Sequence, residues 1–373
     1  MRTASVNQAP AVPYHTPIRA VFQPRVLFLF RGTRYILPTD STVFLTLSGN
    51  AEFAAQGVKL GYTQGAYAKV DMCDSSKLTV QRQLAVGTEV GSTGVCHIAG
   101  DNLNLRAWNP DDGNNVIPLA IGTSGGHGVI EGWGIFINHT WSPGTSSRYV
   151  NTYLRGKIIA DGDGEDRDLD PTLITIYNGI DEVNANGDSG WYARNGGRLF
   201  FPHNTAVSGG AVTIGDNAAR ETPELVNSFR VQLTGAADGH YLHSALYAAD
   251  RTDLPGELPM ADGDVALGVW RMGYASGGQF TSAPSKAKTF TSADVTIRYG
   301  TSTLKLGRKY RVRALRWNGS AWVEATSFLV TKSSSNGLVT FSGLEPYSDD
   351  SYYNIGWTAL VAQKIGHFAI SFR

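Results

Sequence analysis

The chain has 373 residues, which is long enough for two or three domains and for a buried core without disulfides or metal ions. Lys plus Arg and Asp plus Glu both number 32, so the formal net charge is zero, which disfavours a strongly basic nucleic-acid-binding protein. No uninterrupted apolar run approaches the ~20 residues of a membrane-spanning helix. Glycine is abundant at 43 residues, but a Gly-X-Y period is missing, which excludes a collagen-like chain.

The N-terminal segment 1–20 is rich in proline and poor in the residues that build a core. We expect an extended arm there, ordered only where it docks on another surface. The same segment has no apolar stretch of the kind found in a signal peptide. The sequence therefore predicts a chain that is made in a cytoplasm without an export signal.

Strand patterns dominate the rest of the chain. Apolar and polar residues alternate at 228–234, 293–299 and 309–317, which predicts strands with one buried face. Turn residues such as Asn318-Gly319-Ser320 separate many of these short runs, a pattern typical of antiparallel sandwiches and jelly rolls.

We therefore predict an all-β protein with two tandem antiparallel β-sandwich or jelly-roll domains. The first covers 21–218 and carries long polar loops, and the second covers 225–373. One short helix is expected at 219–227, close to the boundary between the two domains. The pattern at 367–372 predicts a final strand.

Two cysteines, Cys73 and Cys96, stand apart in the first half. Their spacing is neither a disulfide framework nor the paired spacing of a zinc site. Two buried thiols are the favoured interpretation, and a single bridge is the alternative.

The acidic run at 161–170 is the strongest candidate for a metal site. Asp161, Asp163 and Asp166 alternate with glycines and further carboxylates, which is how a tight loop gathers oxygen ligands for calcium. A loop of the EF-hand type would need glycine at the position of Asp166, so the match is poor. An exposed acidic turn without a cation is favoured, and no cofactor is predicted.

No motif assigns a reaction. The sequence lacks a Gly-X-Ser-X-Gly elbow, and its histidines and carboxylates have no spacing that selects a triad or a metal centre. Trp133, Trp141, Tyr149 and Tyr153 gather in a loop-rich stretch, where their rings could stack on a sugar or fill a core. We expect the second, and we predict no enzymatic site.

A basic strand is the main candidate for an interface. Alternation over 309–314 places Lys309, Arg311 and Arg313 on one face and Tyr310 with two apolar residues on the other. The basic face could bind nucleic acid, protect a sheet edge, or contact an acidic neighbouring subunit. We expect these cations to be exposed in the single subunit and to face acidic groups in an assembly, with no specific nucleic-acid binding.

The segment 304–315, LKLGRKYRVRAL, resembles the late strands of a fibronectin type III or immunoglobulin-like sandwich. The resemblance implies a tyrosine corner, in which the Tyr310 hydroxyl bonds back to the backbone of the turn at 304–307. It also suggests Trp270 as the inward-facing tryptophan of that fold.

Low charge, abundant glycine, an extended arm and long polar loops together resemble bacteriophage virion structural proteins, although no specific family is indicated. The resemblance implies a non-enzymatic capsid, decoration or tail subunit that contacts copies of itself and other virion subunits. Such a protein would be made in the host cytoplasm and located in the virion. The alternative is a secreted or surface carbohydrate-binding protein or glycosidase with an immunoglobulin-like module.

Overall fold

The computed structural model describes most of the 373 residues and confirms the all-β prediction over the residues that it describes. The described residues are 18–22, 27–36, 42–99, 103–105, 119–122, 126–133, 136–137, 152–154, 157–162, 173–176, 180–183, 190–214, 229–277, 286–299, 304, 308–331, 337–347 and 353–365. Within them every regular element is a strand, and no helix is long and apolar enough to cross a membrane.

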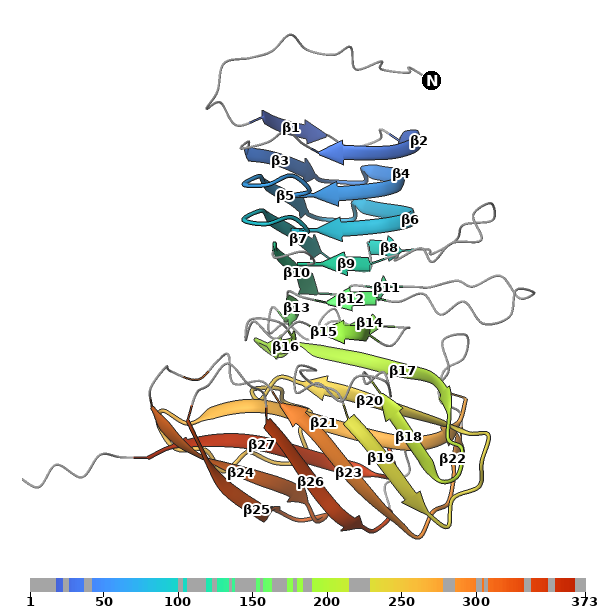
Figure 1. Cartoon of the computed structure of the whole chain (residues 1–373), viewed down its shortest axis with the longest axis vertical. Coiled ribbons are helices and arrows are strands. Elements are labelled where there is room, and N and C mark those ends of the chain that lie inside the picture. The colour runs from blue at the N-terminus through green and yellow to red at the C-terminus, as the bar shows by residue number, and fades with distance from the viewer. Residues whose placement is uncertain are drawn as a thin grey trace, which may run out of the picture.

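The first half of the chain folds into a stack of coils (Figure 1). One sheet holds seven parallel strands, one from each coil: β1 (Ile18–Phe22), β3 (Thr42–Leu47), β5 (Tyr67–Met72), β7 (Thr93–Ala99), β10 (His127–Trp133), β13 (Lys157–Asp161) and β16 (Gly190–Arg194). The opposite sheet holds the other strands of the coils: β2 (Leu27–Ile36), β4 (Glu52–Leu60), β6 (Lys77–Val86), β8 (Leu103–Leu105), β9 (Leu119–Ile121), β11 (Phe136–Ile137), β12 (Thr152–Leu154), β14 (Leu173–Ile176), β15 (Ile180–Val183) and β17 (Arg198–Ala206).

This parallel stack corrects the expectation of an antiparallel sandwich or jelly roll in the first half. β3 pairs with β5 in parallel, and β5 pairs with β7 in the same way. The prediction of strands was right, but the prediction that they pair in antiparallel fashion was wrong. Alternation of apolar and polar residues shows which face of a strand is buried, but it does not show the direction of the neighbouring strand.

The core of the stack follows from that alternation. In β5 every second residue is buried, so Ala68, Val70 and Met72 point inward between the two sheets. Leu60 and Leu84 of the opposite sheet belong to the same hydrophobic cluster. In each coil the strand of the first sheet therefore packs its apolar face against the strand of the second sheet, and successive coils extend one continuous core.

Glycines form the corner where three of the coils leave the second sheet. Gly61, Gly87 and Gly122 follow Leu60, Val86 and Ile121, and all three have φ near +60°, a left-handed conformation that favours glycine. The Gly87 amide donates to the Leu60 carbonyl at 2.7 Å, and the Gly122 amide donates to the Val86 carbonyl at 2.9 Å. The corners thus continue the hydrogen-bond ladder from coil to coil.

Later coils divide their second strand in two. β8 and β9 both pair with β6, and the residues between them, 106–118, lie outside the described part of the chain. In β4 and β6 the same position is marked only by a shift in register near Gly57. β11 and β12, which pair with β8 and β9, are likewise separated by residues 138–151, so the division recurs at the same place in the next coil.

The strand β17 joins the stack to the second half of the chain. It pairs in parallel with β14 and antiparallel with β20 (Tyr241–Tyr247). The sheet then continues through β21 (Val265–Ser276), β27 (Gly356–Lys364), β24 (Lys309–Trp317) and β25 (Trp322–Thr331), with the short β22 (Lys286–Ala287) beside β21. One sheet therefore runs from the coils to the far end of the molecule (Figure 1).

A second antiparallel sheet covers the inner face of this extension. Its order is β18 (Ala211–Ile214), β19 (Phe229–Thr234), β23 (Ser292–Tyr299) and β26 (Gly337–Leu344). Apolar residues of the two sheets share one cluster, including Val295 and Phe341 from one and Val312 and Leu360 from the other. The second half is therefore antiparallel, as the sequence pattern predicted.

The strand that carries the immunoglobulin-like pattern lies as predicted. β24 begins at Lys309, and Tyr310, Val312 and Ala314 are all buried in the inner cluster. Trp270 is also buried there, with 1% of its surface exposed. Leu304 is buried too, whereas the rest of the turn at 304–307 lies outside the described residues.

Several sequence predictions fall on residues that the structure does not describe. These are residues 1–17 of the expected arm, the expected helix at 219–227 and the expected strand at 367–372. Residues 18–20, which were assigned to the arm, belong to β1 and pair with β3.

Candidate interaction face

The basic residues predicted from the sequence lie on the outer face of β24, away from the inner cluster. Lys309 and Arg311 are exposed and Arg313 is partly buried, and they alternate with the buried Tyr310 and Val312. We call the exposed side of β24 and β25 the outer hairpin face. The turn between the two strands is the predicted one, with the Ser320 and Ala321 amides donating to the Asn318 side chain at 3.0 and 2.9 Å.

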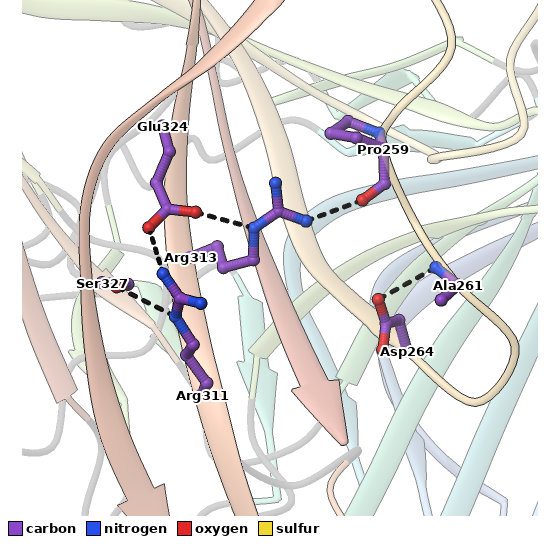
Figure 2. A network of polar contacts seen from close by, with 7 residues as sticks. All are labelled: Pro259, Ala261, Asp264, Arg311, Arg313, Glu324 and Ser327. Carbon is purple, nitrogen blue, oxygen red and sulfur yellow. Dashed lines mark hydrogen bonds and ion pairs between the residues drawn. The ribbon is translucent and has the colours of Figure 1, made fainter. Parts of the chain in front are cut away.

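One carboxylate joins the two arginines of this face (Figure 2). Arg311 Nη2 lies 2.6 Å from Glu324 Oε1, and Arg313 Nε lies 2.9 Å from Glu324 Oε2. Arg311 also donates to the Ser327 hydroxyl at 3.1 Å, and Arg313 Nη1 donates to the Pro259 carbonyl at 2.9 Å. Each oxygen of Glu324 therefore accepts from a different guanidinium group.

A break in the strand register places Glu324 there. Arg311 stands opposite Leu329 and Arg313 opposite Ser327, but the register shifts between Ala314 and Leu315. Regular pairing would set Ala325 opposite Leu315 and turn Glu324 to the inner face. The bulge sets Glu324 opposite Leu315, so its side chain lies on the outer face. The chain itself therefore supplies one carboxylate to these arginines, and their contact with acidic groups of a neighbouring subunit stays a prediction.

We predict that Arg313→Ala will raise the pKa of Glu324. The hydrogen bond from Arg313 is the largest cause that holds the pKa of this carboxyl below its ordinary 4.5, and Arg311 and Ser327 add smaller contributions. Titration of the side-chain carboxyl by NMR checks this. Arg316→Ala, on the same strand, is the control and should leave the pKa of Glu324 unchanged. Because Glu324 is exposed and ion pairs at the surface contribute little, loss of this ion pair should cost about 1 kcal/mol or less of stability.

A strap covers much of the sheet beside this face. It is the connection from β20 to β21, residues 248–264, which has no regular secondary structure. Leu258 is buried in an outer cluster with Leu315 and Val361, and the Trp322 indole donates to the Gly256 carbonyl at 2.9 Å. The strap therefore packs on the sheet and brings the Pro259 carbonyl to Arg313 (Figure 2).

Arginine and aromatic side chains pack together in the same outer cluster. The Arg271 guanidinium lies 4.3 Å from the ring centre of Tyr353 and 4.9 Å from that of Trp357. Tyr247 packs on Trp357 with the ring centres 4.7 Å apart. Tyr353 and Trp357 are 9% and 5% exposed, so their rings serve the packing of the sheet and offer no open surface for a sugar.

His243 gives this cluster a measurable dependence on pH. It is fully buried, 4.7 Å from the Tyr353 ring centre, and burial followed by the charge of Arg271 lowers its pKa from 6.5 to about 3. Between these two values the unfolded chain holds a proton that the folded chain does not. Stability should therefore fall as the pH decreases through this window, by at most about 1.4 kcal/mol per pH unit from this residue.

Chemical unfolding of the wild type and of His243→Leu at pH 7 and pH 5 checks this prediction. The loss of stability between the two pH values should be smaller in the variant by about 2 kcal/mol. The comparison uses differences between pH values, so a general destabilisation of the variant does not affect it. Equal losses in the two proteins would contradict the assignment.

The other candidates from the sequence belong to the coils or lie outside the described residues. Asp161 ends β13, and Asp163 and Asp166 lie outside the described residues, so the calcium prediction stays open. Trp141 and Tyr149 also lie outside them. Among the residues that are described, no group of three His, Cys, Asp or Glu side chains is arranged to hold a metal ion. Cys73 and Cys96 are both free, and burial raises the pKa of the Cys96 thiol to about 12.

Sequence reasoning missed Glu324, Ser327 and the strap. Glu324 had a readable signal, since it is the single carboxylate between 309 and 331 and lies across a predicted turn from the two arginines. The contact with Pro259 had no signal in the sequence, because a strap without regular secondary structure has no periodic pattern of apolar residues.

Comparison with protein families, curated proteins and solved structures finds no match to this chain.

Proposed function

We propose that this protein is a non-enzymatic structural subunit of a virus particle, a bacteriophage capsid, decoration or tail subunit. It acts by contact with copies of itself and with other subunits of the particle. Its place is the virion, which it reaches from the host cytoplasm. The proposal assigns it no cofactor and no substrate.

The observation that carries the proposal is the continuous sheet that passes from the coils through β17 into the antiparallel strands. Every strand of that sheet is hydrogen-bonded to its neighbours, so the coils and the second half have no flexible linker between them at this point. A continuous sheet of this kind holds the coils and the antiparallel half at a fixed separation, which suits a structural component of a particle. The low content of charged residues, 17%, agrees with a surface that is largely covered in an assembly.

Immunogold electron microscopy tests the proposal. Particles are purified from cultures whose cells make the chain, and they are labelled with an antibody raised against residues 42–99. We expect gold at a repeated position on the particles. Label confined to the soluble fraction, or hydrolysis of a polysaccharide by the purified chain, would overturn the proposal.

A further inference from the structure

We propose that the exposed edge of β25 is a self-association site, where β25 of a second copy adds in antiparallel fashion and continues the sheet across a two-fold axis. The inference deepens the proposed function, since it names the surface through which copies of the chain meet. Three observations carry it: the open edge, the exposed Leu329 on that edge, and the absence of charge from residues 326–331 of β25.

β25 is an open edge. Within the described residues it pairs only with β24, and it ends the order of the largest sheet. An edge strand offers a row of backbone donors and acceptors to any strand that comes alongside. Proteins usually protect such edges with charged residues, proline, a bulge or a very short strand. β25 has a bulge near Glu324, but the six residues that follow it, 326–331 (TSFLVT), include no charged residue and no proline.

The most exposed large hydrophobic residue lies on this edge strand. Five large hydrophobic residues among the described ones are strongly exposed: Val90, Met260, Leu329, Leu338 and Ile365. Leu329 is the most exposed at 71%, and it lies on β25 itself. The Ile365 amide contacts the Lys309 carbonyl at the start of β24, and Met260 directly follows Pro259, which binds Arg313. Met260 and Ile365 are therefore tied to the neighbouring β24, and Leu329 alone of the five lies on the edge strand.

The charge along the edge favours a second copy as the occupant. Residues 326–331 of β25, TSFLVT, carry no charge, so an identical strand meets no like charge when it pairs there. Antiparallel addition across a two-fold axis continues the sheet and places β25 beside β25, while Arg311 and Arg313 stay one strand away and share the Glu324 carboxylate. Backbone pairing and the burial of Leu329 then supply the attraction.

Analytical ultracentrifugation of the full chain tests the inference. The wild type should be a dimer whose mass depends on concentration in the micromolar range. Leu329→Lys should raise the dissociation constant roughly tenfold or more, because it places like charges close together across the axis. Val90→Lys is the matched control. It makes the same change at an apolar residue that is 59% exposed on the coils, and it should leave the dimer intact.

A second variant tests the role of charge without adding bulk. Glu324→Gln leaves Arg311 and Arg313 uncompensated on both copies, so the dimer should weaken at low salt and recover part of its affinity between about 0.05 and 0.5 M salt. The wild-type dimer should respond less to salt than this variant.

The outcomes separate this inference from the proposed function. An oligomer that Leu329→Lys leaves intact, or one that dissociates with Leu338→Lys instead, would overturn the inference while labelled particles still supported the function. A wild type that stays monomeric throughout would also overturn it. If the dimer depends on Leu329 but the antibody labels no particle, the inference is supported and the proposed function is contradicted.

Discussion

Gly87→Ala should prevent the coils from stacking, with a loss of about 4 kcal/mol or more of stability, at the upper end of what single substitutions cost. Gly87 has φ +59°, and a Cβ built there would lie 1.8 Å from the His127 carbonyl oxygen and 2.8 Å from the Gly128 amide nitrogen. Both atoms belong to the backbone of the next coil. They are held by the pairing of β10 with β7, so they cannot move aside as a flexible side chain could.

Two matched variants separate the sources of this loss. Gly209 has nearly the same φ, +60°, but nothing lies within 4 Å of its Cβ position, so Gly209→Ala should cost only the left-handed conformation, about 1–2 kcal/mol. Gly128 lacks the positive φ, but its Cβ would lie 2.2 Å from the Val86 carbonyl oxygen. Gly128→Ala therefore measures the close approach of the coils without the conformational cost.

Limited proteolysis and thermal unfolding by circular dichroism provide the measurement. We expect the alanine variants to rank in stability as Gly209 above Gly128 above Gly87, with new cleavage between 61 and 133 in the last two. Equal stability of the Gly87 and Gly209 variants would mean that the coils do not approach closely at this corner.

These corner glycines are also the signal from which the stack could have been predicted. An apolar residue followed by glycine recurs at 60–61, 86–87 and 121–122, and the first two are 26 residues apart. Repetition at such a period is typical of stacked coils. A strand-by-strand interpretation does not use it, because each strand taken alone has the same alternation in a parallel and in an antiparallel sheet.

The hairpin of β24 and β25 was more easily predicted, because a short turn joins its two strands. β24 spans the predicted residues 309–317, and the turn at 318–320 fixes its pairing with β25. The bulge beside Ala314 was not predictable, since nothing local distinguishes it from regular pairing. It decides where Glu324 lies, and so the basic strand was found from the sequence whereas its acidic partner was not.

Trp270→Ala should destabilise the antiparallel half by about 3–5 kcal/mol, the usual cost of removing a large buried aromatic side chain. Trp270 is 1% exposed and belongs to the inner cluster between the two sheets. Its ring lies against the backbone of Gly268, where an added Cβ would meet ring atoms at 2.3, 2.5 and 2.9 Å. Gly268 thus provides the space that the indole fills.

This contact makes the two positions interdependent, which a double-mutant cycle can measure. Gly268→Ala alone should destabilise the protein, because the rigid ring has no room to move. In a Trp270→Ala background the added methyl group has no ring to meet, and it fills part of the cavity instead. The cost of the double variant should therefore be smaller than the sum of the two single costs, with an interaction of about 1–3 kcal/mol in chemical unfolding. Additive costs would show that the ring does not rest on Gly268. Trp317→Ala, at a half-buried tryptophan on the outer face, is the control and should add to Gly268→Ala without any interaction.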